Sequence, residues 1–446
     1  MTRLKTKKAV SLFASGGIGD LAIREAGWHV IVANEILEDR VQLYRANYPE
    51  TEMLAGDIRL LEGKIIERTK DLLGGEELDL LFATPPCQGM SKNGRGKLLR
   101  SIRDGLKPKF DERNQLIVNA VNCIKSLKPR LVVFENVPEM ENTVIKDNAG
   151  IVLNILDYIV RELSPDYHGQ WKVVEFADYG VPQRRQRLIT VFTRDFEMKR
   201  YLEISKTFFP PETHSKSGNL FTKKWVSISE ALRGVPSLDG SSEITALSTL
   251  PYHYVPILDS DKYFWVSNTP PGKGAFDNQC INPKCKFDKN PIHGASHNHE
   301  GINQSNKNTP IYCQKCGELL PRPWVKCGNE YRLMSGFTSA YKRMRSDLPA
   351  AALTRNFSYA CSDQKIHPYE HRVLSLYEAF ILHTINDFNY SWERFDGKKV
   401  SDKTIREVIG ESVPPKGLLM IFNFLRSLSY QSELRAVFEK SYSETL

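Results

Sequence analysis

The sequence of 446 residues has no apolar stretch long enough to span a membrane, so we expect no membrane-spanning helix. Its first residues also lack the apolar region and the small-residue cleavage site of a secretory signal peptide. Its eight cysteines are too few for a disulfide framework in a chain of this length. We therefore expect a globular protein that acts in the cytoplasm and has no membrane partner.

Internal repeats, low-complexity segments and the GxxxxGK[ST] pattern of nucleotide-triphosphate sites are missing as well. The chain is instead basic, because 61 Lys and Arg residues against 53 Asp and Glu residues give a net charge of +8. The basic residues cluster in KTKK (5–8), RGKLLRSIR (95–103) and QRRQR (183–187). This distribution fits a polyanionic partner, although basic clusters alone are more often solvated surface.

Hydrophobic patterning indicates the fold class. Within residues 1–195, short apolar runs alternate with helical patterns, which predicts an α/β fold with a parallel sheet and helices on both faces. The expected strands are 9–14, 29–35, 78–84, 129–136 and 187–193. Helical patterns occupy 21–27, 40–48, 371–385 and 417–428. Regular periodicity fades between residues 196 and 340, so we expect a second, irregular domain there.

The segment SLFASGGIGD (11–20) predicts a strand that runs through a glycine turn into a helix. Glycines let the backbone approach a ligand at a helix N-terminus, although many such turns carry glycine for packing only. Glu35 closes the next strand, where a carboxylate can hold ribose hydroxyls, and Asp57 follows the turn after that. Ligand-type residues at successive strand ends favour a cofactor that contains adenosine.

The segment ATPPCQGMS (83–91) places two prolines between an apolar strand and Cys87. Because proline cannot continue a strand, Cys87 is expected at the carboxyl edge of the sheet, where ligands bind. Glu135, in FENVP (134–138), ends another apolar strand at the same edge. It could contact a helix N-terminus, or it could act as an acid beside a nucleophilic cysteine. The alternative for Cys87 is a thiol that only packs at a turn.

Together with the arginines of QRRQR, these segments resemble the motifs of the C5-cytosine DNA methyltransferases of bacterial and phage modification systems. The similarity continues in YKRMRSDLPAAALTRNF (341–357), IHPYEHRVLSLYEA (366–379) and IGESVPP (409–415). The family usually has glycine where Ser15 stands and asparagine where Glu411 stands. The order of the motifs implies a Rossmann-like S-adenosylmethionine-dependent methyltransferase fold with a smaller, irregular target-recognition domain.

The resemblance also implies roles for individual residues. Cys87 would be the nucleophile, Glu135 would engage cytosine N3, and Arg185 and Arg187 would position the base. The residues implied to bind S-adenosylmethionine are Phe13, Gly16, Gly17, Ile18, Glu35, Asp57, Ile58 and Pro86. Cytosine C5 is a weak nucleophile, so a thiolate must add at C6 before C5 can accept a methyl group, and the base must first be flipped out of the duplex. The basic segment 91–116 could then close over DNA, or it could be a plain surface loop.

Cysteine pairs in CINPKC (280–285) and YCQKCGELLPRP (312–323) have the spacing of a zinc ribbon. The four expected ligands of a structural Zn²⁺ ion are Cys280, Cys285, Cys313 and Cys316. The histidines between the pairs are expected to be loop surface, and Cys123, Cys327 and Cys361 are expected to be ordinary buried thiols.

The resemblance divides the chain into a catalytic domain (1–195), a target-recognition domain (196–340) with a zinc-ribbon-like segment (278–323), and C-terminal motifs (341–446) that return to the catalytic domain. We expect a sequence-specific DNA (cytosine-5-)-methyltransferase of a restriction–modification system. Its partners would be double-stranded DNA and a cognate restriction endonuclease encoded separately, and it would act as a monomer. The alternatives are a transfer-RNA cytosine-5 methyltransferase and a catalytically idle DNA-binding regulator.

Overall fold

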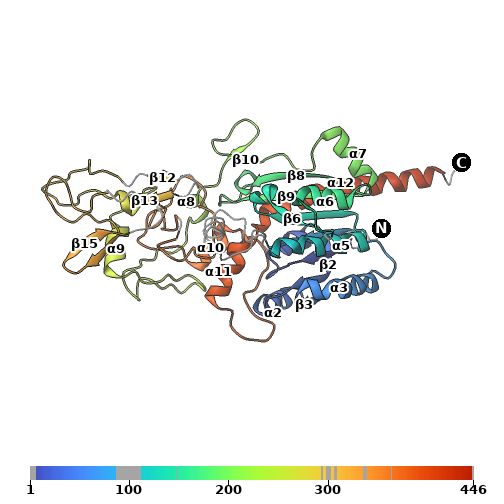
Figure 1. The fold of residues 1–446 in the computed structure, drawn as a ribbon, viewed down its shortest axis with the longest axis horizontal. Helices are drawn as coiled ribbons and strands as arrows, with labels where there is room; N and C mark the ends of the chain where they lie inside the picture. The colour runs from blue at the N-terminus through green and yellow to red at the C-terminus, as the bar shows by residue number, and fades with distance from the viewer. Residues whose placement is uncertain are drawn as a thin grey trace.

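The structure is a computed structural model that describes residues 7–86, 112–147, 149–292, 295–297, 303–305, 309–334, 339–362 and 364–443. Figure 1 shows two lobes: a sheet flanked by helices holds both ends of the chain, and a less regular lobe is built from the middle of the chain. The last helix, α12 (Pro415–Ser443), runs back across the sheet lobe. Among the described residues, no helix is both long enough and apolar enough to cross a membrane.

The first lobe is built on a seven-stranded sheet with the order β3-β2-β1-β4-β5-β9-β8. The strands are β1 (Lys7–Leu12), β2 (Trp28–Glu35), β3 (Glu52–Ala55), β4 (Leu80–Ala83), β5 (Leu131–Asn136), β8 (His168–Glu175) and β9 (Gln186–Thr193). The α/β class and all five predicted strands are confirmed, and β3 and β8 are additional. The expectation of an entirely parallel sheet is wrong, because β9 is antiparallel to both β5 and β8.

Helices cover both faces of this sheet, as predicted. On one face lie α1 (Ile18–Glu25) and α12, and on the other lie α3 (Ile58–Leu73), α5 (Leu116–Leu127) and α6 (Ile155–Leu163). Successive strand residues point to opposite faces, so in β1 Ala9 joins one core and Val10 the other. Burial on both faces explains why the strands read as continuous apolar runs. Phe422 of α12 packs edge-to-face on Phe82 of β4, with ring centroids 5.6 Å apart.

Further short elements border the sheet lobe. They are α2 (Glu38–Asn47), η1 (Glu112–Gln115), η2 (Pro138–Asn142), β6 (Val144–Lys146), β7 (Val152–Asn154), η3 (Phe176–Tyr179), α7 (Phe196–Ser205), η5 (Ile385–Asp387) and α11 (Asp402–Glu411). The helix predicted over 371–385 is shorter, because α10 covers only Leu376–Leu382. Its start is set by a capping box in which Ser375 and Glu378 satisfy each other's backbone amides.

The second lobe has little regular structure, as the fading periodicity predicts. Its elements are β10 (His214–Ser215), β11 (Lys223–Lys224), α8 (Ile228–Ala231), α9 (Ser260–Ser267), η4 (Ala275–Asp277), β12 (Ala295–His297), β13 (Asn303–Ser305), β14 (Trp324–Cys327) and β15 (Glu330–Leu333). Trp265 packs between Trp324 and Tyr341 in a core of its own. The buried guanidinium of Arg343 donates to the carbonyls of Thr269, Val266, His367 and Glu370, and so ties irregular segments together.

Candidate active site

The glycine turn after β1 takes an unusual backbone path. Phe13 and Ser15 adopt positive φ angles of 60° and 51°, and Gly17 has a φ of 83° at the start of α1. A left-handed conformation is costly for residues with a side chain and persists only where the surroundings impose it. The carbonyls of Gly16 and Gly17 accept hydrogen bonds of 2.6 Å from the hydroxyls of Tyr390 and Tyr48. A Cβ atom at Gly17 would lie only 2.4 Å from the Tyr48 ring, so close packing against this tyrosine is one reason for glycine there.

Glu35 fixes this turn to the end of β2. One carboxylate oxygen accepts the backbone amide of Ser15 at 2.8 Å, and the other accepts the amides of Ile36 and Leu37 at 2.9 Å. The buried carboxylate thus compensates three backbone donors and holds Ser15 in its left-handed conformation. Its interaction with ribose hydroxyls stays a prediction.

Asp57 begins α3 at the next strand end. Its side chain accepts the backbone amide of Arg59 at 3.0 Å, so it is the N-cap of the helix. The Arg59 guanidinium also contacts both carboxylate oxygens and holds the pKa of Asp57 below its usual range. Ile58 is buried behind it.

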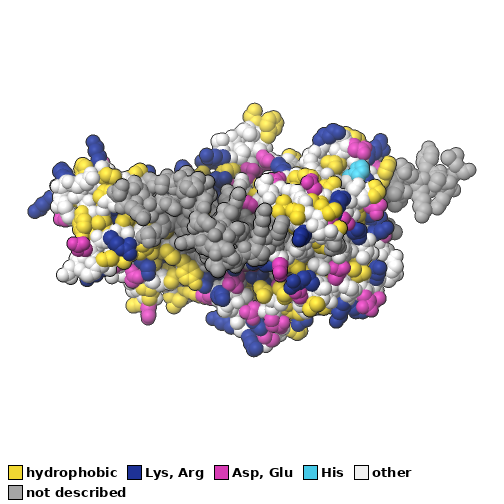
Figure 2. Space-filling view, in the orientation of Figure 1, with side chains coloured by type: hydrophobic (Ala, Val, Ile, Leu, Met, Phe, Trp, Pro, Cys, Tyr) yellow, Lys and Arg dark blue, Asp and Glu magenta, His cyan; other side chains and the backbone are white. Residues whose placement is uncertain are grey.

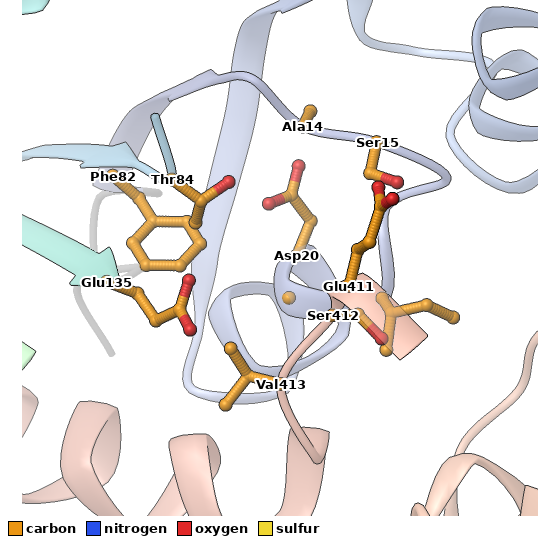
Figure 3. A pocket seen from close by; sticks show the side chains of 11 residues that line it. Ala14, Ser15, Asp20, Phe82, Thr84, Glu135, Glu411, Ser412 and Val413 are labelled. Carbon is orange, nitrogen blue, oxygen red and sulfur yellow. The ribbon is translucent and has the colours of Figure 1, made fainter. Parts of the chain in front are cut away.

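A pocket of about 380 Å³, partly open to solvent, lies between the glycine turn, the ends of β4 and β5, and the segment after α11 (Figure 3). Its lining residues are Ala14, Ser15, Ile18, Gly19, Asp20, Phe82, Thr84, Glu135, Glu411, Ser412 and Val413. Of the residues predicted to bind a cofactor, Ile18 lines this space directly, and the others surround the turn and the strand ends. Three carboxyl groups, those of Asp20, Glu135 and Glu411, therefore line one small pocket.

Asp20, in the first turn of α1, is a pocket residue that the sequence reasoning missed. It is fully buried, and burial raises its pKa to about 6. Its two oxygens accept hydrogen bonds from the Ser11 hydroxyl at 2.8 Å and the Tyr44 hydroxyl at 2.6 Å. The available signal is an acidic residue among the apolar residues of the first turns of a helix that follows a glycine turn.

Glu411 lies near Ser15, on the side of the pocket opposite Glu135 (Figure 3). One of its oxygens lies 2.7 Å from Nη2 of Arg40 in α2, and the other lies 3.5 Å from Nη1 of Arg355. The carboxylate that replaces the family's usual asparagine therefore forms ion pairs with two arginines at the pocket wall. The sequence showed the departure at Glu411 but not its partners, because Arg40 lies near the other end of the chain.

The antiparallel direction of β9 brings the predicted arginines to the carboxyl edge of the parallel strands. Asn136, the last residue of β5, pairs with Leu188 near the start of β9. As a result, Nε of Arg187 lies 2.8 Å from Oε1 of Glu135. Burial raises the pKa of the Glu135 carboxyl, and the charges of Arg187 and Arg185 oppose this rise.

Arg185 is buried and forms its hydrogen bonds with the last hundred residues of the chain. Its guanidinium donates to the carbonyl oxygens of Leu353 and Gly410, each at 2.8 Å. Burial lowers the pKa of Arg185 well below its usual value. The arginine thus joins the start of β9 to two segments from the last hundred residues of the chain.

Cys87 lies outside the described residues, but the segment before it is well defined. Thr84 donates through its amide to Leu12 and through its hydroxyl to Phe13. The carbonyl of Pro85 accepts the side-chain amide of Asn136 at 2.9 Å, and the half-buried Pro86 follows. The strand that leads to Cys87 therefore ends beside the residue that follows Glu135.

A second cluster lies in the other lobe. Its members are Cys280, Cys285, Cys313 and Cys316, whose sulfur atoms all lie within 4.8 Å of one another. Two of the separations are 3.6 Å and 3.9 Å. A tetrahedral zinc ion with Zn–S bonds of about 2.3 Å separates its sulfurs by about 3.8 Å. The cluster therefore has the dimensions of a four-thiolate metal site.

The remaining cysteines differ from expectation in part. Cys123 is buried, as predicted. The prediction for Cys327 and Cys361 is wrong, because both are exposed. Cys327 ends the edge strand β14, and its sulfur accepts a hydrogen bond from Nε of Arg332 at 3.2 Å.

The sheet with one reversed strand and the pocket at its carboxyl edge define an α/β protein of the methyltransferase class. The family model of C-5 cytosine-specific DNA methylases matches residues 7–426, so the chain belongs to this family.

Known proteins agree with this assignment. Type II methyltransferase M1.HgaI of Avibacterium volantium is 28% identical over 439 residues, which cover 95% of this chain and 98% of that protein. Type II methyltransferase M1.HphI of Haemophilus parahaemolyticus is 30% identical over 186 residues, which cover 42% and 45% of the two chains. Among solved structures, a DNA modification methyltransferase encoded within an E. coli prophage has a TM-score of 0.53 and 20% identity, and covers 95% of this chain and 99% of its own. This last similarity supports the fold.

Proposed function

We propose that the protein transfers a methyl group from S-adenosylmethionine to C5 of a flipped-out cytosine in a specific duplex DNA sequence. Such an activity would protect DNA in a restriction–modification system. Family membership and the similarity to Type II methyltransferases support the proposal. The observation that carries it is the pair of Glu135 and Arg187, which borders the acidic pocket and lies at the sheet edge to which Pro86 leads.

The pocket fits the proposed cofactor. It lies at the carboxyl edge of the sheet, where ligands bind in open α/β folds, and its lining includes Ile18 and the carboxyl groups of Asp20, Glu135 and Glu411, which can accept hydrogen bonds. The residues that we propose to hold S-adenosylmethionine are Phe13, Gly16, Gly17, Ile18, Glu35, Asp57, Ile58 and Pro86. When bound, S-adenosylmethionine supplies an electrophilic methyl group.

The chain's own residues would perform the remaining chemistry. The Cys87 thiolate adds to C6 of the flipped cytosine, and Glu135 donates a proton or hydrogen bond to N3, so electron density moves to C5. Burial favours the protonated carboxyl of Glu135 that this step needs. Arg187 fixes the orientation of the carboxyl. After C5 has been methylated, loss of its proton expels Cys87 and restores the ring.

We also propose that the cysteine cluster binds a structural Zn²⁺ ion. Four thiolates close the coordination sphere and leave no position for a reactive water, so the ion would brace the segment 278–323. The target-recognition domain would then comprise residues 196–340, between a catalytic domain (1–195) and the returning C-terminal motifs (341–446). Metal analysis of the purified protein should find one zinc per chain, and Cys316→Ser should lower that ratio. A zinc content near zero in protein that remains fully folded would contradict the proposal.

We also propose that the protein acts in the cytoplasm as a monomer and that its restriction endonuclease is encoded separately. Bisulfite sequencing of DNA from cells that express the protein would report the modified base and its sequence context together. Duplex oligonucleotides and transfer RNA offered in parallel would separate the two nucleic-acid substrates. Covalent trapping on duplexes that contain 5-fluorocytosine should require Cys87. Methylation of transfer RNA alone, or binding to DNA without trapping, would overturn the proposal.

A further inference from the structure

A protruding loop carries two exposed apolar side chains at the junction of the lobes. Residues 216–222 connect β10 to β11 and stand out from the molecule between the sheet lobe and the irregular lobe (Figure 1). Leu220 and Phe221 are 97% and 91% exposed. Figure 2 shows hydrophobic side chains gathered at the outer end of this loop. Single exposed apolar residues are common, but a neighbouring pair at a loop tip indicates a contact surface.

The loop is ordered by its own hydrogen bonds. The side-chain oxygen of Asn219 accepts hydrogen bonds from the backbone amides of Phe221 at 2.8 Å and Thr222 at 2.9 Å. The backbone amide of Asn219 donates to the Thr222 carbonyl at 2.9 Å. The hydroxyls of Ser215 and Thr222 lie 2.7 Å apart. These hydrogen bonds preorganise the loop, so binding of a partner would cost little conformational entropy.

The base of the loop is joined to the segment that carries the site arginines. Nε1 of Trp225 donates to Oδ1 of Asp178 at 2.8 Å, and the Arg184 guanidinium lies 5.2 Å from the centre of the Trp225 ring. The amide of Thr213 donates to the Asp178 carbonyl at 3.0 Å. Arg184 directly precedes Arg185, so the base of the loop packs against the segment that leads into β9 and the Glu135 pair.

The charged side chains around the loop indicate which kind of partner it binds. Lys216, Lys223 and Lys224 are exposed beside the apolar tip, and Glu212 nearby is paired with Lys172 at 3.0 Å. A basic rim around an apolar tip complements nucleic acid, where phosphates attract lysines and apolar side chains pack on sugars or wedge between bases.

We propose that the loop 216–222 contacts duplex DNA beside the target nucleotide, with Leu220 and Phe221 packed against sugar or base edges and the lysines on phosphates. This inference rests on the proposed function, because it assumes a DNA substrate. The test compares two variants, L220S/F221S and K223Q/K224Q, with the wild-type chain. The affinity for an unmethylated duplex that contains the target sequence found by bisulfite sequencing is measured by fluorescence anisotropy over a series of salt concentrations.

We expect L220S/F221S to weaken duplex binding about 10-fold, in line with apolar contacts to unstacked bases. We expect K223Q/K224Q to lower the slope of log K against log salt concentration by about two, since each phosphate contact contributes about 0.9. Affinity for S-adenosylmethionine, measured by calorimetry, should stay unchanged in both variants.

The control is I151S/V152S, which changes two neighbouring apolar residues of the sheet lobe that are 55% and 50% exposed. It should bind DNA as the wild type does, and equal thermal midpoints would show that all chains are folded. If the wild type methylates duplex DNA while both loop variants bind it normally, the loop proposal is overturned and the proposed function stands. If the wild type binds no duplex, both proposals fall.

Discussion

The buried carboxyl of Asp20 allows a quantitative prediction about pH. A pKa of about 6 in the folded protein in place of 3.8 means that the folded state binds the proton more tightly than the unfolded chain. The protonated carboxyl therefore contributes stability that is fully present below pH 3.8 and is lost as the pH rises through 6. The full effect is about 3 kcal/mol, of which about 2 kcal/mol is lost between pH 4.5 and 7.5.

Asp20→Asn removes this titration and keeps the shape of the side chain. The Ser11 hydroxyl or the Tyr44 hydroxyl must turn to accept a hydrogen bond from the new amide, which both hydroxyls can do. Urea-induced unfolding of both chains at several pH values should show that the stability of the variant relative to wild type improves by about 2 kcal/mol from pH 4.5 to 7.5. Asp71→Asn, on the exposed side of α3, is the control. Parallel profiles of wild type and Asp20→Asn would refute the reasoning.

Three further predictions concern the pocket. Ser15→Gly should raise stability by up to about 1 kcal/mol, because glycine adopts the left-handed conformation without steric cost; an unchanged or lower thermal midpoint would contradict this. Glu411→Gln removes the negative partner of Arg40, and calorimetry should show a larger loss of affinity for cationic S-adenosylmethionine than for neutral S-adenosylhomocysteine; equal losses would count against a charge effect. Glu135→Gln should lower kcat by about 10²–10⁴-fold. In the wild type, activity should fall as the pH rises through the raised pKa of Glu135, and the variant should lose this dependence; a retained dependence would assign it to another group.

The sequence predicted those parts of the fold that have a strong local signal. The central strands are buried on both faces, so each appears as an apolar run. β3 buries only its two middle residues, and most residues of the edge strand β8 retain contact with solvent, so neither forms such a run. The direction of β9 has no local signal at all, because an apolar strand looks the same in either direction.

The candidate site was predictable to the extent that its residues lie in compact motifs. The spacing of the two cysteine pairs indicated that they come together, and their sulfurs do cluster. The ion pair of Arg40 with Glu411 could not be found in this way, since it depends on how the last helices return to α2. Asp20 escaped notice because an acidic residue in the first turn of a helix is usually exposed and interacts with the helix dipole.

The arginines of QRRQR show how one short motif can serve two purposes that only the structure separates. Both arginines are expected to position the base; in the structure Arg187 contacts Glu135, and Arg185 donates to the carbonyls of Leu353 and Gly410. Gly410 directly precedes Glu411, Ser412 and Val413, which line one wall of the pocket. Arg185 and Arg187, two residues apart where β9 begins, therefore connect the pocket wall and Glu135 to one short segment. If the pocket holds the cofactor as we propose, a change at Arg185 should affect cofactor binding through this wall, whereas a change at Arg187 should act on the carboxyl of Glu135.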